Sequence, residues 1–304
     1  MNPGKTGNKV INLSREKAVR TGGQKGGGVS GAAALRRPRV MAITSGKGGV
    51  GKTNIVANLG IALSQLGHKV LVLDADLGLG NLDILLGLAP KYNFSHVIKG
   101  EKSVTEVLVE GPQGIKILPA SSGILEMTQL TRDEKIGIFN QLDQVVEPFD
   151  ILLIDTAAGI SSNVIYFNTA AQEILVVVAP EPTAITDAYA LMKVLSLKHD
   201  TRRFRLLVNM ATDPGEAEDV HRQLTMVANR FLNIEIDYLG FIPRDPNVVR
   251  GVKYQQAVRD LFPHSPASKS FSRIAKIVAR RAVSAHSGEG RGLFRNSLNG
   301  GVGE

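Results

Sequence analysis

Residues Ser45 to Thr53 read S-G-K-G-G-V-G-K-T and fit the pattern G-x-x-x-x-G-K-[ST] of a phosphate-binding loop. An apolar run over 40–43 precedes this stretch and a helical pattern over 54–66 follows it, which is the context that such a loop requires. Its glycines let backbone N–H groups curl around a polyphosphate. The predicted phosphate-binding residues are Gly46, Lys47, Gly48, Gly49, Val50, Gly51, Lys52, Thr53 and Asn54.

Two side chains of this loop have predicted roles of their own. The ammonium of Lys52 is expected between the β- and γ-phosphates of the nucleotide. The hydroxyl of Thr53 is expected to ligate Mg²⁺, and the helix that follows would direct its N-terminus at the anion. The alternative is a glycine-rich turn between a strand and a helix without a ligand.

The second lysine of the loop, Lys47, indicates a particular kind of loop. The string K-G-G-V-G-K-T resembles the deviant Walker A motif of the MinD and ParA ATPases. In that family the first lysine reaches across a dimer to the nucleotide of the partner. The resemblance therefore implies an ATP-dependent homodimer, with Lys47 and Lys52 among the catalytic residues.

Length and composition restrict the class of protein. The chain has 304 residues, of which 43% are hydrophobic and 21% charged, so we expect one large α/β core. The absence of cysteine excludes disulfides, thiolate metal sites and a cysteine nucleophile, and fits a reducing cytoplasm. No apolar run approaches the ~20 residues of a membrane span, and the N-terminus lacks the apolar core of a signal peptide.

The net charge of +8 is concentrated at the N-terminus. Residues 1–39 contain nine lysines and arginines but one acidic residue, which leaves 27 basic and 27 acidic residues in 40–304. The leader is also rich in glycine and cannot bury enough apolar surface to fold. We therefore predict a flexible basic arm over 1–38, an ATPase domain over 39–283 and a flexible tail over 284–304. The arm is either a solvated linker or a segment that docks a partner or an anionic surface.

Apolar runs alternate regularly with helical patterns from residue 39 onward. Expected strands after the first are 69–74, 115–118, 151–155, 174–178, 204–208 and 236–242, and expected helices are 133–146, 163–171, 184–199 and 217–231. The runs are apolar throughout, as in strands buried on both faces. The pattern predicts a single α/β domain with a mostly parallel, doubly wound sheet, helices on both faces, and ligands at the carboxyl ends of the strands.

Carboxylates follow two of these runs. The second strand ends in D-A-D-L-G-L-G-N-L-D, which resembles the corresponding MinD segment; by that resemblance Asp76 orients the attacking water and Asp74 supports the Mg²⁺ shell. The family usually has a basic residue where this chain has Gly80. The run 151–154 ends at Asp155, the Walker B pattern of a Mg²⁺-binding carboxylate. The T-A-A-G that follows resembles the family's switch, in which the backbone of Gly159 senses the γ-phosphate.

The base is predicted to be adenine. A guanine site would require N-K-x-D, whereas this chain reads N-M-A-T-D from Asn209. By family resemblance the amide of Asn209 and the loop of Pro243, Arg244 and Asp245 clasp the base. The cofactors predicted are therefore ATP and Mg²⁺.

The segment E-P-T-A-I-T-D-A-Y over 181–189 also resembles MinD, where it caps a helix at the dimer face. With the loop and N-L-D-I-L-L-G-L, it resembles most the flagellar-number regulator branch, FlhG and FleN. That branch engages an SRP-type GTPase through an N-terminal extension, and in some bacteria restrains a flagellar transcription activator; basal-body components are further expected partners. The arm here lacks the D-Q-A-x-x-L-R sequence often found in that extension.

Other functions remain open from the sequence. A ParA-type partition ATPase would bind DNA non-specifically, but the neutral charge of 40–304 argues against DNA as a partner. A MinD-type septum-positioning ATPase and a nucleotide-dependent anti-activator with negligible turnover are further alternatives. Iron–sulfur carriers are excluded because they need cysteine.

The C-terminal end has two stretches that suit a membrane surface. The helical pattern over 271–283 is amphipathic, although such a helix more often packs on its own domain. In the tail, Leu293, Phe294 and Leu298 share one helical face near Arg291 and Arg295, which resembles the membrane-targeting helix of MinD and FlhG. We expect a cytoplasmic protein that binds the inner face of the anionic membrane reversibly, as a dimer, with a polar position possible for this family.

Overall fold

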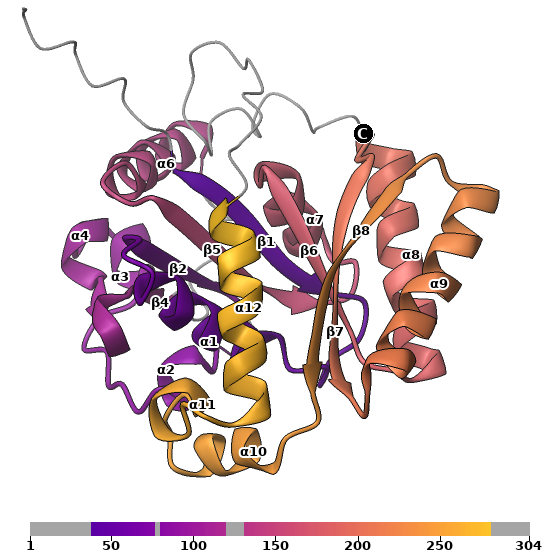
Figure 1. Ribbon diagram of the computed structural model, residues 1–304. Coiled ribbons are helices and arrows are strands. Elements are labelled where there is room, and N and C mark those ends of the chain that lie inside the picture. The colour runs from indigo at the N-terminus through magenta and orange to yellow at the C-terminus, as the bar shows by residue number, and fades with distance from the viewer. Residues whose placement is uncertain (1–37, 77–79, 120–130, 281–304) are drawn as a thin grey trace, which may run out of the picture. The chain divides into compact units, whose positions relative to one another are not determined.

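The computed structural model describes residues 38–76, 80–119 and 131–280, and Figure 1 shows their arrangement. Eight strands form one sheet in the order β3-β4-β2-β5-β1-β6-β7-β8. Every neighbouring pair is parallel except β3 and β4, which are antiparallel. The predicted fold class, a single α/β domain with a mostly parallel doubly wound sheet, is confirmed.

The strands are β1 (Arg39–Ser45), β2 (Val70–Ala75), β3 (Val109–Glu110), β4 (Lys116–Pro119), β5 (Ile151–Ala158), β6 (Glu173–Val178), β7 (Arg203–Ala211) and β8 (Glu235–Pro243). The helices are α1 (Lys52–Ser64), α2 (Leu82–Leu85), α3 (Phe94–Ile98), α4 (Val104–Val107), α6 (Arg132–Val146), α7 (Ser162–Ala170), α8 (Pro182–His199), α9 (Pro214–Phe231), α10 (Pro246–Lys253), α11 (Val258–Leu261) and α12 (Pro266–Arg280), with a 3-10 turn η1 (Pro112–Gly114).

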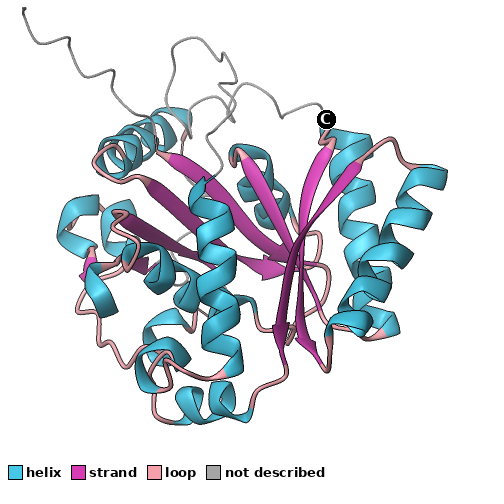
Figure 2. Cartoon of the chain, viewed as in Figure 1, coloured by secondary structure: helices cyan, strands magenta, loops and turns pink. Residues whose placement is uncertain are grey.

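Helices cover both faces of the sheet, as Figures 1 and 2 show. Helices α1 and α12 pack against each other on one face, and α6, α7, α8 and α9 lie on the other. The strands between them are apolar on both sides, so alternate residues of β2 and β5 belong to two different clusters of buried side chains. This burial explains the near-continuous apolar runs of the central strands.

The order of the strands places the predicted motifs together. Strand β1, which ends in the phosphate-binding loop, lies between β5 and β6, and β5 also pairs with β2. Asp74 of β2 lies directly opposite Asp155 of β5 in the parallel register. The loop and both carboxylates therefore meet at the carboxyl edge of the sheet, where ligands bind in folds of this type.

The C-terminal helix α12 is part of the folded domain. Phe271, Ile274, Ala275 and Val278 are buried, and the helix packs on α1 and β8. Of the two interpretations of this amphipathic pattern, packing on the domain is the one that holds. None of the helices within 38–76, 80–119 and 131–280 has the length and apolar character needed to cross a bilayer. The arm up to residue 37 and the tail from residue 281 lie outside the described residues, so their predicted boundaries remain predictions.

Candidate functional site

The phosphate-binding loop connects β1 directly to α1. At two of its positions the structure explains why the residue is glycine. A Cβ on Gly46 would lie 2.1 Å from the backbone carbonyl of Asp187, because α8 packs closely on the loop. Gly51 precedes the first residue of α1 and has φ of 88°, a left-handed conformation that favours glycine. A Cβ on Gly48 or Gly49 would meet no heavy atom of the described residues within 4 Å. That open side of the loop is available to a ligand.

Lys52 and the two paired aspartates form a buried charged cluster. Lys52 is 8% exposed, Asp74 4% and Asp155 1%. Burial lowers the pKa of Lys52, and the negative charges of Asp155 and Asp76 oppose that shift. Burial also raises the pKa of Asp74 to about 6, against hydrogen bonds from the backbone of Asp76 and Leu82. The arrangement therefore leaves negative charge only partly neutralised beside the lysine.

Asp155 is the most isolated member of this cluster. Burial raises its pKa to about 7, with a further contribution from Asp74, while Thr53 and Lys52 act in the opposite direction. Neither of its carboxylate oxygens accepts a hydrogen bond of normal geometry from the described residues. A buried carboxylate without such partners is costly unless a cation compensates it. Asp155 and Thr53 therefore fit the requirements of a Mg²⁺ site.

The protein supplies only part of such a coordination shell. Within the described residues, no group of three His, Cys, Asp or Glu side chains is placed to hold a metal ion. Magnesium commonly keeps several waters and binds through one or two carboxylates together with the phosphates of a nucleotide. The donor set of Thr53, Asp155 and Asp74 suits magnesium that arrives with a nucleotide.

Asp155→Asn is expected to stabilise the nucleotide-free protein at pH 8 by about 1 kcal/mol or more, because it removes an unpaired buried charge. The wild-type pKa is about 7 in the folded state, against an ordinary value of 3.8. The destabilising effect is therefore fully present above pH 7, decreases as the pH falls from 7, and is lost only near the ordinary value of 3.8, so it is smaller at pH 5 than at pH 8. Urea unfolding at pH 5 and pH 8, without nucleotide, measures it. An equal difference at both pH values would contradict the assignment.

Asp76 follows the end of β2 and is less buried than the other members of this cluster. Its backbone N–H donates to Oδ1 of Asp74 at 3.2 Å, and its carboxylate is near enough to influence the pKa of Lys52, Asp74 and Asp155. A Cβ on Gly80 would lie 3.0 Å from Oδ2 of Asp74, so this position offers little room for the basic residue usual in the family. Asp74 itself is held in place by the N–H groups of Asp76 and Leu82.

Lys47 points to α8 in this structure. Its ammonium donates to Oε2 of Glu181 at 2.9 Å and to Oγ1 of Thr183 at 2.8 Å. Both partners belong to the E-P-T segment at the start of α8, and the Lys47 side chain is 38% exposed. An exposed pair of this kind contributes about 0 to 1 kcal/mol, so it can be exchanged for another partner at little cost.

The predicted switch residue Gly159 is hydrogen-bonded to the start of the phosphate-binding loop. Its N–H donates to the carbonyl of Ser45 at 2.9 Å, and the Ser45 hydroxyl donates to the carbonyl of Lys47 at 2.7 Å. Gly159 has φ of 93°, and a Cβ there would meet none of the described atoms within 4 Å, so the turn is open to a ligand. For this N–H to sense a γ-phosphate, it must exchange its present bond to Ser45.

The predicted base-binding residues lie on the same edge but have structural partners. Nδ2 of Asn209 donates to the carbonyl of Val50 at 2.8 Å, which joins the end of β7 to the phosphate-binding loop. The carboxylate of Asp245 accepts from the N–H groups of Asn247 at 2.9 Å and Ala267 at 3.0 Å. Although burial raises the pKa of Asp245, those hydrogen bonds prevail and lower it. Asp245 thus caps α10 and holds the start of α12.

The other residues predicted to hold the base connect the ends of β7 and β8. The N–H of Arg244 donates to the carbonyl of Ala211 at 2.8 Å, and Pro243 lies opposite Ala211 in the register of β7 and β8. Asn54 contributes its carbonyl to a hydrogen bond from Nδ2 of Asn58 at 2.8 Å, within α1. Contacts of these residues with a nucleotide remain predictions.

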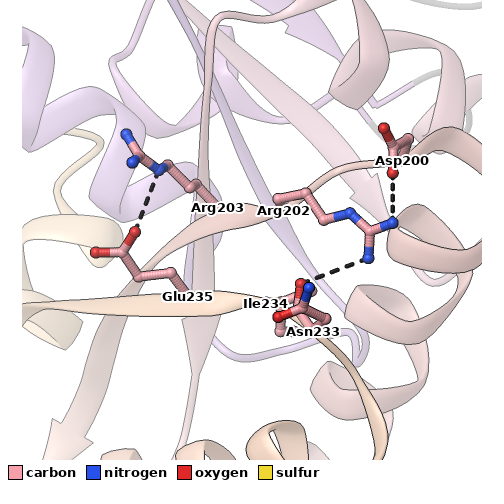
Figure 3. A pocket seen from close by; sticks show the side chains of 6 residues that line it. All are labelled: Asp200, Arg202, Arg203, Asn233, Ile234 and Glu235. Carbon is pink, nitrogen blue, oxygen red and sulfur yellow. Dashed lines mark hydrogen bonds and ion pairs between the residues drawn. The ribbon is translucent and has the colours of Figure 1, made fainter.

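A separate pocket of about 470 Å³ lies at the amino-terminal end of β7 and β8, and Figure 3 shows the side chains that line it. Arg202 pairs with Asp200 at 2.5 Å, and Arg203 pairs with Glu235 at 3.1 Å. Its two arginines and two acidic residues balance, and Arg203 and Glu235 begin the paired segments of their strands, far from the carboxyl edge. This pocket is therefore not part of the nucleotide site.

The sequence interpretation did not anticipate the partners of Lys47. It identified the E-P-T segment as a helix start at a dimer face, but not that Glu181 and Thr183 contact the lysine in the same chain. The sequence interpretation also missed that Asp245 caps α10. The Asp-Pro pair at 245–246 could have indicated it, because proline favours the first position of a helix.

The chain is similar to a known protein family and to proteins whose names refer to anti-activation and to the flagellum. A family model described as an AAA domain matches residues 38–208. Antiactivator FleN of Pseudomonas aeruginosa is 47% identical over 79% of this chain and 86% of its own length. Flagellum site-determining protein YlxH of Helicobacter pylori is 36% identical over 80% of this chain and 82% of its own.

Solved structures of similar proteins have the same fold as this chain. Septum site-determining protein MinD of Pyrococcus horikoshii, complexed with Mg-ADP, is 25% identical and superposes with a TM-score of 0.65 over 80% of this chain and 96% of its own. This chain therefore shares its fold with MinD. It also has the loop with two lysines and the aspartates beside it. The chain belongs to the MinD/ParA-type P-loop ATPases, near the branch that contains FlhG and FleN.

Proposed function

We propose that the chain is an ATP-dependent, dimerising ATPase that regulates the number or placement of flagella. The observation that carries the ATPase part is the open loop with two lysines, placed at the sheet edge against three aspartates. The flagellar part is supported by FleN and YlxH, whose names associate them with anti-activation and flagellar site determination.

In this proposal each residue of the edge has one task. Lys52 and the N–H groups of the loop bind the β- and γ-phosphates, Thr53 and Asp155 hold Mg²⁺, and Asp74 keeps its shell in place. Bound magnesium neutralises charge that develops on the phosphates. Asp76 orients the attacking water. Phosphoryl transfer needs positioning and charge neutralisation more than covalent chemistry. These residues supply both kinds of contribution, so no covalent nucleophile of the protein is needed.

Dimerisation would give Lys47 a new partner. In the single chain Lys47 is bound to Glu181 and Thr183, and by the family's mechanism it contacts the nucleotide of a second chain. Its present contacts are exposed, so releasing Lys47 from them costs at most about 1 kcal/mol, which supports the proposal. The gain on release is a charge-assisted contact with phosphate.

Analytical ultracentrifugation tests the proposal with nucleotide-free protein, Mg-ADP, and Mg-ATP with the slow variant Asp76→Ala. A dimer that forms only with Mg-ATP, together with release of phosphate by the wild type, supports it. Protein that neither binds ATP nor changes its mass would refute the ATPase function. Retention of flagellar proteins from a lysate by the ATP-bound form only would support the cellular role.

Glu181→Gln is expected to favour the ATP-bound dimer, lowering its dissociation constant by about twofold to fivefold. The amide keeps the size of the side chain but removes the charge that holds Lys47 in its own chain, a pair worth up to about 1 kcal/mol. Sedimentation across a concentration series with Mg-ATP measures this shift. Glu110→Gln is the matched control, because it removes the acidic partner of Lys116 in another exposed pair. A weaker dimer in Glu181→Gln would instead identify Glu181 as a dimer contact.

The proposed partners follow from the family and from the parts of the chain beyond the described residues. An SRP-type GTPase, a flagellar transcription activator and basal-body components are the protein partners that the branch implies. Reversible attachment of the tail to the anionic inner face of the cytoplasmic membrane, strengthened by two tails on one dimer, is the proposed location.

A further inference from the structure

Asn168 of helix α7 is a fully buried polar side chain that has no part in the cluster of charges described above. Its Nδ2 donates to Oγ1 of Thr44 at 3.2 Å and to the carbonyl of Val164 at 2.7 Å. Its Oδ1 accepts no hydrogen bond from the described residues. A buried amide oxygen without a partner destabilises the folded state, and a leucine of similar size would avoid that effect. The amide therefore calls for a reason other than packing.

Thr44 connects this amide to the start of the phosphate-binding loop. It is fully buried near the end of β1 and immediately precedes Ser45, where the loop begins. At this point β5 has one extra residue, because the pairing of β1 with β5 shifts register between Ile43 and Ser45. Such a bulge disrupts the backbone ladder locally. The bond from Asn168 to Thr44 is thus a side-chain link at the place where the backbone pairing is interrupted.

The turn that follows β5 is held on both of its sides. Before the turn, the hydroxyl of Thr156 donates to the carbonyl of Ile43 at 3.1 Å. After the turn, Asn168 holds α7 to β1 through Thr44. The turn itself is short and begins with Gly159, directly after the end of β5. The position of α7 therefore limits where the N–H of Gly159 can point.

We propose that Asn168 is a positioning residue for ATP hydrolysis, which fixes α7 so that the N–H of Gly159 can meet the γ-phosphate. This inference rests on the proposed ATPase function and assigns a residue outside the nucleotide site itself. The N–H of Gly159 now donates to the carbonyl of Ser45, so it already lies beside the phosphate-binding loop. With both sides of the turn fixed, only the turn has to move when that bond is exchanged. A smaller moving part loses less conformational entropy when the phosphate orders it.

Asn168→Leu separates this role from a role in packing. Leucine keeps the approximate size of the side chain, removes the unpaired oxygen and favours a helix more than asparagine does. We expect the variant to melt no lower than the wild type. Its kcat at saturating Mg-ATP should nevertheless fall about tenfold, since a misplacement of about 1 Å can cost up to about 100-fold. Its dissociation constant for Mg-ADP, which has no γ-phosphate, should change less than about twofold.

A double-mutant cycle identifies the bond through which Asn168 acts. Thr44→Val removes the other partner of the same hydrogen bond and should also lower kcat. The double variant should be no slower than Asn168→Leu alone, because the bond is already absent there. Phosphate release is measured at protein concentrations where the rate per chain is constant, and calorimetry gives the affinity for Mg-ADP.

Ser196→Ala is the matched control. Ser196 is also buried, and its hydroxyl has no hydrogen-bond partner among the described residues. It lies about 21 Å along α8 from the start of that helix at Pro182, so it is remote from the loop. This variant should hydrolyse ATP at the wild-type rate.

A wild-type kcat in Asn168→Leu would overturn the inference. A lower melting temperature together with equal losses in kcat and in Mg-ADP binding would overturn it too, because the fold would then be damaged. A double variant slowed by the product of the two single effects would show that Thr44 and Asn168 act independently, which also contradicts it. The proposed ATPase function fails by a different result, namely wild-type protein that releases no phosphate from Mg-ATP.

Discussion

Lys52→Ala is expected to weaken the binding of Mg-ATP by at least ~100-fold, the effect of losing a buried cationic donor to a phosphate. Lys52 is 8% exposed, and burial lowers its pKa, while Asp155 and Asp76 oppose that shift. The fold therefore holds a cation in a place where solvation is poor, and a bound phosphate would compensate it. Isothermal titration calorimetry with Mg-ATP measures the loss.

The matched control for this variant is Lys69→Ala. Lys69 is exposed and directly precedes β2, so it lies at the end of the strand opposite to Asp74. Thermal melting of both variants establishes that they are folded. If Lys52→Ala binds Mg-ATP within a few-fold of the wild type, the loop is not the phosphate site, and the assignment of Thr53 and Asp155 fails with it.

The location of this site could be predicted from the sequence because each part of it ends a strand. The apolar runs that end at Asp74, Asp155 and Asn209 indicated parallel strands, and parallel strands bring their carboxyl ends to one edge. The loop pattern then identified that edge as a phosphate site. The order of the strands could not be read from the runs alone, yet right-handed crossovers leave few arrangements open.

The parts that the sequence did not reveal depend on contacts between distant residues or on very short elements. Lys47 and Glu181 are separated by 134 positions, so no local pattern relates them. Helices α2, α3 and α4 have four or five residues each, too few for a hydrophobic period to emerge. The left-handed conformation of Met210 is likewise hidden, because methionine carries no preference for it.

Charge in the buried cluster is a further feature that only the three-dimensional structure exposes. The sequence showed Asp74 and Asp155 as separate strand ends, whereas the register places them side by side. Their pKa values are raised to about 6 and about 7, chiefly by burial. At neutral pH the nucleotide-free site therefore titrates partly, and binding of Mg²⁺ is expected to release protons.

Asp76→Ala is expected to slow ATP hydrolysis at least ~100-fold while Mg-ATP binding is retained, so that the ATP-bound dimer accumulates. Asp76 is less buried than Asp74 and Asp155 and stands beside them at the carboxyl edge, where its charge acts on Lys52. This position suits a group that orients water and is not required to bind the phosphates.

Single-turnover hydrolysis and titration with Mg-ATP separate the two effects for Asp76→Ala. Asp219→Ala, at an exposed aspartate of α9, is the control for the loss of one acidic side chain. If hydrolysis and binding fall together, Asp76 belongs to the binding of Mg-ATP, as proposed for Asp155. If hydrolysis continues at the wild-type rate, the attacking water is oriented by another group, and the catalytic role assigned to Asp76 is wrong.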